Sequence, residues 1–249
     1  MNDESKFNPF TVYILSLLLF IRIFYRVGVM YFGYSAIIFS DYYVVTIIYF
    51  LSTLSIYLER KRLFNFYIDR KFFLLFVFSG FFGVLFKPLV FSAIPLVCAI
   101  FMCCLLVRNE FVFQESSQIS INWLVRSILI GFALPILSSI IFRIRLEKSM
   151  DFLYAASAFI SAFTGTVLLE EILFRGLLCG YLSLRKWSPN RIILVQAFLF
   201  WIAHIDYMEK AVYFWIVIPI VSIIFGLIAQ KSKSIFWSTI THAIYNTLI

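Results

Sequence analysis

Long apolar runs separated by short charged segments form the dominant pattern along the chain. A helix needs about 17–25 apolar residues to cross the hydrocarbon core of a bilayer. The runs predict nine spans, at residues 10–27, 29–58, 72–86, 88–107, 122–142, 153–184, 190–207, 211–229 and 234–249. Because the short third run ends at Lys87-Pro88, residues 72–107 form either a hairpin or one broken helix. The expected fold class is therefore all-α, a polytopic transmembrane helix bundle of about eight to nine helices.

The segments between these runs contain no Ser/Gly-rich linker, internal repeat or low-complexity tract. We therefore expect residues 1–249 to form a single integral membrane domain. Asp3 and Glu4 precede the first run, and no small-residue cleavage pattern follows it. This favours an uncleaved first span over a signal peptide.

The composition indicates that lipid covers much of the chain. Of its 249 residues, 63% are hydrophobic and only 14% are charged, which is more apolar surface than one water-soluble core buries. The net charge is +8, but in a membrane protein an excess of Lys and Arg first determines how the spans are oriented. Since the sequence also lacks a Walker loop and a dinucleotide fingerprint, we expect membrane lipid as a partner and no nucleic acid.

Two adjacent carboxylates lie inside the apolar run 153–184, where charges are expensive and suggest function. Glu171 and Arg175 are four residues apart and can pair along one helix. Glu170 lies about 100° further around the helix, so it pairs elsewhere or holds a proton. Burial and a like-charged neighbour both raise its pKa toward the range in which a carboxylate works as a general base near neutral pH. The alternative is that both glutamates merely pair with arginines across helices.

The chain contains two histidines, and both fall within predicted spans rather than in loops. His204 follows Phe200 by four residues, so the two side chains share one helical face. His242 and Asn246 have the same spacing and point the same way from the last span. One buried histidine is more often a core residue, but two, with none elsewhere, favour a site.

The remaining charged residues have simpler interpretations. Arg22 and Arg26 near the first span are expected to reach for the interface or to face a neighbouring helix. We expect Asp206, at the very end of the run 190–207, and Glu110 and Glu115, in the loop after 88–107, to be solvated.

A depth estimate brings the four candidate residues to similar levels in the membrane. At 1.5 Å of rise per residue, Glu170 and His204 each lie roughly 21 Å from the predicted ends of their spans. His242 and Asn246 lie roughly 12 and 18 Å from the start of theirs. Three helices are therefore able to bring these residues around one polar cavity.

The motifs Glu-Glu-x-x-x-Arg, Phe-x-x-x-His and His-x-x-x-Asn follow one another on successive apolar helices. In this order they resemble the CaaX prenyl protease and bacteriocin-processing family of intramembrane proteases. The resemblance covers about 170–246, with the core that carries the motifs at 153–249, and no motif position departs from the pattern. It implies that Glu170 and His204 activate a water, and that His242 and Asn246 donate to the oxyanion. Glu171, Arg175 and Phe200 would support the site.

The resemblance leaves the mechanism and the function with alternatives. Glu170, His204 and His242 also form an acceptable zinc ligand set with an open fourth position. Asn246 is a poor zinc ligand and a good oxyanion donor, so no cofactor is expected, although zinc is possible.

The expected function is an intramembrane endopeptidase that acts on a peptide or a membrane-associated protein, in the bacterial plasma membrane. A role in peptide or bacteriocin maturation or in self-immunity would fit the bacterial members of the family. The alternatives are a non-catalytic immunity or partner-binding protein and a transporter or proton relay. Inverted repeats or paired broken helices would favour a transporter, and the sequence has neither.

Overall fold

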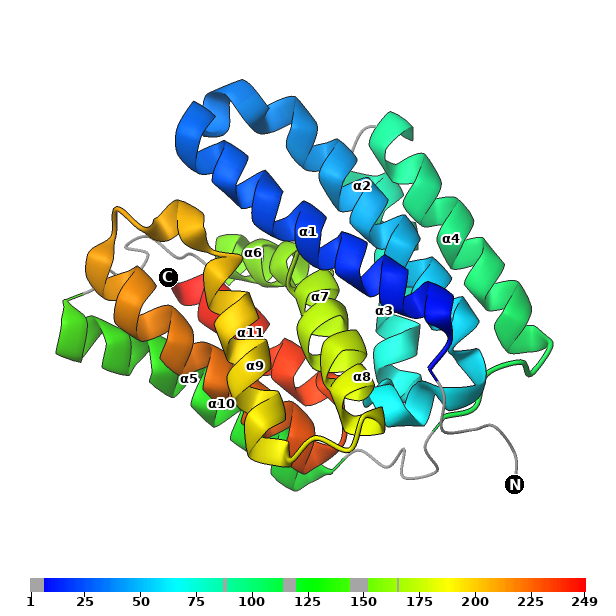
Figure 1. The fold of residues 1–249 in the computed structure, drawn as a ribbon. Helices are drawn as coiled ribbons and strands as arrows, with labels where there is room; N and C mark the ends of the chain where they lie inside the picture. Colours follow the sequence, from blue (N-terminus) through cyan, green and yellow to red (C-terminus); the bar gives the residue numbers. More distant parts are fainter. Residues whose placement is uncertain (1–6, 87–88, 114–119, 144–151, 165) are drawn as a thin grey trace.

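The computed structural model describes residues 7–86, 89–113, 120–143, 152–164 and 166–249. Three features singled out in the sequence lie outside these ranges: Asp3 and Glu4, the Lys87-Pro88 pair, and Glu115. The described residues form helices joined by short turns and contain no strand (Figure 1). The predicted all-α fold class is confirmed.

Eleven α-helices and four short helices of other kinds follow one another along the described chain. Their bounds are α1 Pro9–Phe32, α2 Tyr34–Leu58, η1 Arg60–Phe66, α3 Arg70–Phe86, α4 Leu89–Val107, α5 Ile121–Phe142, α6 Phe152–Thr164, α7 Thr166–Glu170, η2 Glu171–Leu178, α8 Cys179–Leu184, α9 Pro189–Ile202, η3 Ile205–Tyr207, η4 Tyr213–Val217, α10 Ile218–Ser232 and α11 Ile235–Leu248. The helices η2 and η4 are π-helices, and η1 and η3 are 3₁₀-helices.

Five of the nine predicted spans are long and apolar enough to cross a membrane as described. They are Pro9–Phe32, Leu89–Val107, Ile121–Phe142, Leu153–Leu184 and Tyr213–Ser232. The bent pair Tyr42–Leu58 and Arg60–Phe66, which turns by 105°, raises the number to six. The other three predicted spans correspond to α3, α9 and α11, which have only 17, 14 and 14 residues. A straight helix of 14 residues is about 21 Å long, shorter than the hydrocarbon core.

The first helix has well-defined ends and a firm anchor. The Asn8 side chain accepts a hydrogen bond from the Phe10 amide, and Pro9 occupies the first turn, where its missing N–H is not needed. Gly33 has φ 75°, a conformation that favours glycine, and separates α1 from α2. The buried Glu59 at the end of α2 accepts from the Thr11 hydroxyl (2.8 Å), which fixes the start of α1 against α2.

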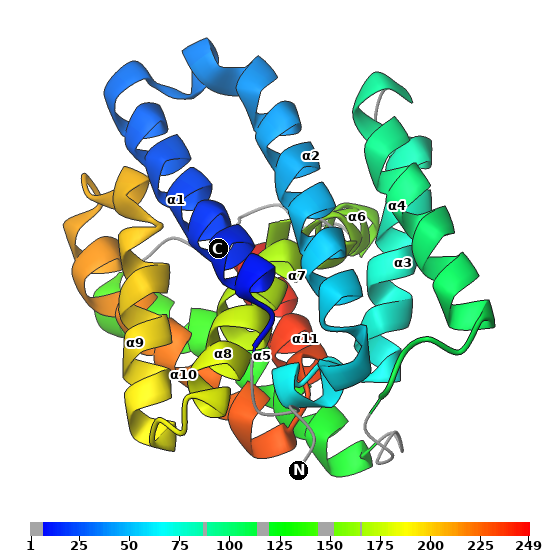
Figure 2. The ribbon, with the colours of Figure 1, turned by 45° about the vertical axis from the view of Figure 1, so that its right-hand side comes forward.

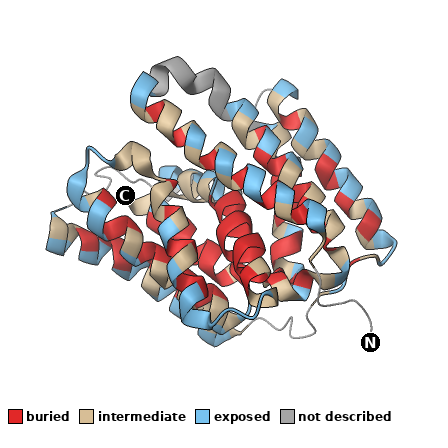
Figure 3. Cartoon of the chain, in the orientation of Figure 1, coloured by how far each residue is buried: buried red, intermediate tan, exposed pale blue. Residues whose placement is uncertain are grey.

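Burial follows the position of each helix in the bundle. α7, η2 and α8 lie between the group α1–α4 and the group formed by α5, α9, α10 and α11 (Figures 1 and 2). Residues 167–180 along these three central elements are buried, whereas α4 and α5 expose many large apolar side chains (Figure 3). Exposed apolar faces of this kind suit contact with lipid. The most polar motif of the sequence is thus placed in the least accessible part of the bundle.

Candidate active site

The paired glutamates lie where the central α-helix changes to a π-helix. Glu170 is the last residue of α7, and Glu171 begins the π-helix η2. A π-helix closes i→i+5 hydrogen bonds, and such turns occur frequently at functional sites. Glu170 is 5% exposed and Glu171 is fully buried. Two carboxylates in such a place need partners, and each finds different ones.

Glu171 is bound by three donors from two elements. Its Oε1 lies 3.1 Å from Nη1 of Arg175, so the predicted pair along the helix is formed. The same oxygen is 2.9 Å from Nδ1 of His242, and Oε2 accepts a short bond of 2.6 Å from the Ser238 hydroxyl. Arg175 is itself fully buried and donates to the Ser222 hydroxyl (3.0 Å). Glu171 therefore fixes the imidazole of His242 and faces away from any open space.

Glu170 faces the opposite set of groups. Its Oε1 pairs with Nη2 of Arg22, which reaches it from α1. The same oxygen is 3.9 Å from Nε2 of His204, and Oε2 is 3.8 Å from Nε2 of His242. A single carboxylate thus has an imidazole nitrogen near each oxygen, at distances longer than a direct hydrogen bond that a water beside them could bridge.

His204 lies two residues beyond the end of α9, not within a helical span as the sequence predicted, and the last turn of α9 orients its ring. Its Nδ1 lies 2.7 Å from the Phe200 carbonyl oxygen. A carbonyl oxygen only accepts, so Nδ1 carries the proton, and in the neutral ring Nε2 presents a lone pair toward Glu170. The Phe200 ring packs on His204 at 4.3 Å and edge-on against His242 at 5.8 Å between centroids. The Phe200 ring thus contacts both imidazoles.

His242 is held by groups on both sides of its ring. The Glu171 carboxylate accepts a hydrogen bond from Nδ1–H of His242, and this bond directs Nε2 toward Glu170. Phe225 of α10 stacks on the ring with 4.6 Å between centroids and 26° between planes. A carboxylate behind the imidazole likewise orients the catalytic histidine of Ser-His-Asp hydrolases.

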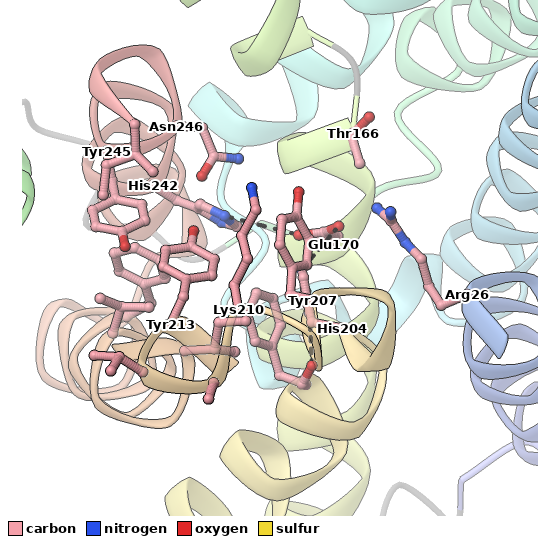
Figure 4. A pocket seen from close by; sticks show the side chains of 17 residues that line it. Arg26, Thr166, Glu170, His204, Tyr207, Lys210, Tyr213, His242, Tyr245 and Asn246 are labelled. Carbon is pink, nitrogen blue, oxygen red and sulfur yellow. Dashed lines mark hydrogen bonds and ion pairs between the residues drawn. The ribbon is translucent and has the colours of Figure 1, made fainter. Parts of the chain in front are cut away.

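The candidate residues line one cavity of ≈ 790 Å³. Figure 4 shows Glu170, His204, His242 and Asn246 directed into it from α7, the end of α9 and α11. His242 is 3% exposed, whereas Asn246 is an exposed residue nearer the end of α11. The wall is completed by Arg26, Thr166, Phe200, Tyr207, Lys210, Ala211, Val212, Tyr213, Ile218, Val221, Phe225, Tyr245 and Ile249.

Two interpretations of charged residues need correction. Asp206 is not solvated: its side chain is 4% exposed, and its Oδ2 lies 2.8 Å from Nη1 of Arg26. Glu110 is 27% exposed at its side chain and pairs with Arg60 (3.1 Å), so it is only partly accessible. Their positions at or after the ends of apolar runs suggested solvent exposure. The sequence alone does not show that an arginine far away in the chain, Arg26 or Arg60, lies beside each carboxylate.

Two residues at the site were missed or undervalued in the sequence. Ser238 precedes His242 by four residues, so the helical spacing used for Asn246 would also have found it. Arg22 is a charge within an apolar run, which is itself a functional signal. Its partner Glu170 is not deducible from spacing, since the two residues lie on helices far apart in sequence.

Among the residues that the structure describes, no group of three or more His, Cys, Asp or Glu side chains has the arrangement of a metal site. The guanidinium of Arg22 already pairs with Glu170, one of the three side chains that the sequence suggested as zinc ligands with His204 and His242. A guanidinium at this carboxylate opposes the binding of a second cation to it.

Comparison with known proteins finds a similarity in the C-terminal part of the chain. The family model described as "Type II CAAX prenyl endopeptidase Rce1-like" matches residues 152–248. The match extends from α6 to α11 and includes all seven residues of the three motifs. No curated protein and no solved structure matches the chain. Together with the long apolar helices, the match shows an integral, multi-pass membrane protein.

Proposed function

Because residues 152–248 match the model of the Rce1-like type II CAAX prenyl endopeptidases, we propose that this protein is an intramembrane endopeptidase. It hydrolyses a peptide bond in a peptide or a membrane-associated protein. The observation that carries the proposal is the Glu170 carboxylate with the Nε2 atoms of His204 and His242 at 3.9 and 3.8 Å, beside an open cavity.

In the proposed reaction, a water molecule binds between Glu170 and Nε2 of His204. Glu170 accepts a proton from this water while the oxygen of the water forms a bond to the scissile carbonyl carbon. The proton then passes to the departing amine nitrogen as the C–N bond breaks. The Phe200 carbonyl keeps the His204 proton on Nδ1, which leaves Nε2 available to accept from the water. The reaction therefore needs no covalent intermediate.

The negative charge that appears on the carbonyl oxygen is stabilised by Asn246 and His242. The Asn246 amide donates as it stands. His242 donates from Nε2 when its ring carries both protons, a form that the Glu171 carboxylate at Nδ1 stabilises. Donors fixed in a site of low polarity act strongly on charge that appears only in the transition state. Three neighbouring side chains hold His242 in place: Glu171 bonds to its ring, Arg175 pairs with Glu171, and Phe200 packs against the ring.

We propose that the water is activated without a metal. The Arg22 guanidinium beside Glu170 supports this, since a zinc ion would have to share that carboxylate with it. Full activity after exhaustive chelation, with no zinc in the purified protein, is the expected result. Activity that is lost on chelation and restored only by zinc would overturn the metal-free mechanism.

The description of the matching family suggests which substrate class to test first. A prenylated peptide that ends in a CAAX sequence is the first probe, because the matching family is described by that activity. A bacterial plasma membrane, with a role in peptide or bacteriocin maturation or self-immunity, is the proposed setting. Membrane lipid is the proposed surrounding partner.

The decisive experiment replaces the two water-activating residues separately. Glu170→Gln and His204→Ala variants with parental levels in the membrane are expected to lose cleavage of the probe. Cleavage that persists in both variants would overturn the catalytic assignment. In cells that depend on the protein for immunity, protection that survives in Glu170→Gln would instead favour a binding function, because the same cavity would then act without hydrolysis.

A further inference from the structure

The first helix lies beside the candidate site and carries two arginines four residues apart. Arg22 pairs with Glu170, and Arg26 pairs with Asp206 at 2.8 Å. Each of the four side chains is at most 9% exposed. Residues 9–32 lie outside the region that matches the family model. The contacts of α1 therefore add something to the site that the family match does not describe.

Arg22 acts directly on the proposed general base. The oxygen of Glu170 that pairs with Arg22 is the one that lies 3.9 Å from His204. An adjacent guanidinium favours the ionised carboxylate, and only that form accepts a proton. The planar guanidinium also limits how the carboxylate turns, because arginine donates in a fixed geometry. Both effects serve the same step of the proposed reaction.

Arg26 acts on His204 through the short turn that follows it. Asp206 belongs to the 3₁₀-helix η3, two residues beyond His204. This turn is closed by a hydrogen bond of 3.0 Å from the Tyr207 amide to the His204 carbonyl. An ion pair that holds Asp206 consequently restrains the backbone of His204. Arg26 also lines the cavity, and Figure 4 shows it opposite His242 and Asn246.

We propose that Arg22 and Arg26 are positioning residues of the site: Arg22 keeps Glu170 ionised and oriented, and Arg26 fixes the turn that carries His204. The proposal rests on the proposed function for its catalytic part. It makes α1 a component of the catalytic unit rather than a membrane anchor placed before it.

The kinetic test uses the full-length protein in lipid nanodiscs with a prenylated CAAX peptide as the probe. Arg22→Gln is expected to lower kcat roughly 10- to 100-fold, as expected for a displaced catalytic group, with KM within about twofold of the parent. Arg22→Lys restores part of kcat, because lysine keeps the charge and loses the planar geometry. Arg60→Gln breaks a distant ion pair by the same substitution and is the control, with unchanged kcat.

The second arm tests Arg26 by exchanging charges. Arg26→Asp lowers kcat, and the double variant Arg26→Asp/Asp206→Arg restores most of it, since neither residue is assigned to the chemistry. A parental kcat in both Arg22→Gln and Arg26→Asp would overturn the proposal. So would a rise in KM at constant kcat, which would make the arginines substrate-binding residues, or a loss that follows thermal stability alone.

A spectroscopic readout separates failure of this proposal from failure of the proposed function. The chain has only two histidines, so ¹⁵N-histidine labelling gives two imidazole spin systems, which a His242→Asn variant assigns. Arg26→Asp and Arg22→Gln are expected to shift the His204 signals, and the charge exchange returns them. This result is independent of cleavage. A protein that cleaves no probe yet shows these shifts keeps the positioning contacts and loses the proposed activity; unshifted His204 signals in both variants would refute the positioning contacts.

Discussion

The buried pair of Glu171 and Arg175 gives the sharpest test of the site. Glu171→Gln keeps the shape of the side chain and removes its charge. The glutamine oxygen can still accept from His242, and its amide can donate to the Ser238 hydroxyl, because that hydroxyl is able to donate to the Ile235 carbonyl (3.0 Å) instead. The main loss is therefore the negative charge opposite Arg175.

The magnitude follows from the complete burial of both partners. Both side chains are 0% exposed. In Glu171→Gln the Arg175 guanidinium stays charged, and neither a carboxylate nor bulk water compensates its charge. Removing one member of such a pair destabilises by about 3–5 kcal/mol. In a chain of this size about 1 kcal/mol lowers Tm by about 2–4 °C, so the expected decrease is about 6–20 °C.

The double variant Glu171→Gln/Arg175→Met separates stability from catalysis. Replacing a buried ion pair by apolar groups is often neutral or stabilising, so Tm is expected to return toward the parent. Cleavage of the prenylated peptide stays about 10²- to 10⁴-fold lower, because His242 still lacks the negative charge that stabilises its doubly protonated ring. Thermal unfolding in detergent, followed by tryptophan fluorescence, measures the first effect. A parental Tm for Glu171→Gln, or a double variant less stable than the single one, would refute this reasoning.

Two further substitutions test the packing around the site. Gly180→Ala would place a Cβ atom 2.2 Å from the Phe66 ring and should destabilise the folded protein by about 1–3 kcal/mol. Gly176→Ala, whose Cβ meets no atom closer than 3.5 Å, is the matched control. Equal Tm values for the two variants would contradict the close approach at Gly180. Asp69→Ala removes a carboxylate that accepts from the Phe72 amide and the Ser234 hydroxyl, both at 2.9 Å, and should lower the free energy of unfolding by about 1–2 kcal/mol, measured as a decrease in Tm. Ser234→Ala loses the bond to Asp69 and the N-cap bond from the Phe236 amide (3.2 Å), so a decrease of similar size is expected.

Hydropathy was sufficient to predict where the helices lie, because lipid exposure demands long apolar runs whatever the packing. The predicted run 122–142 corresponds to α5 at 121–142, and 88–107 to α4 at 89–107. The same pattern failed to show that α9 and α11 are short, and it gave no sign of the π-turn that begins at Glu171. These features depend on contacts with other helices rather than on local composition.

Within the site, the quality of each prediction followed the distance along the chain. The pair Glu171 and Arg175 and the shared face of Phe200 and His204 depend on a spacing of four and appear as expected. The bond between Glu171 and His242 joins residues 71 apart, and it determines the orientation of that ring. Spacing identified which residues could take part. It did not identify their partners.

The location of Arg22 and Arg26 on the first helix has a consequence for biosynthesis. Arg26 is made 180 residues before Asp206, an interval of roughly 9–36 s at about 5–20 residues per second. During this interval α1 has to enter the membrane with two arginines whose acidic partners do not yet exist. The insertion penalty is about 2.5–3.5 kcal/mol for each arginine at the centre of a helix. Until Glu170 and Asp206 have been made, α1 therefore carries this penalty in the bilayer without the ion pairs that later offset it.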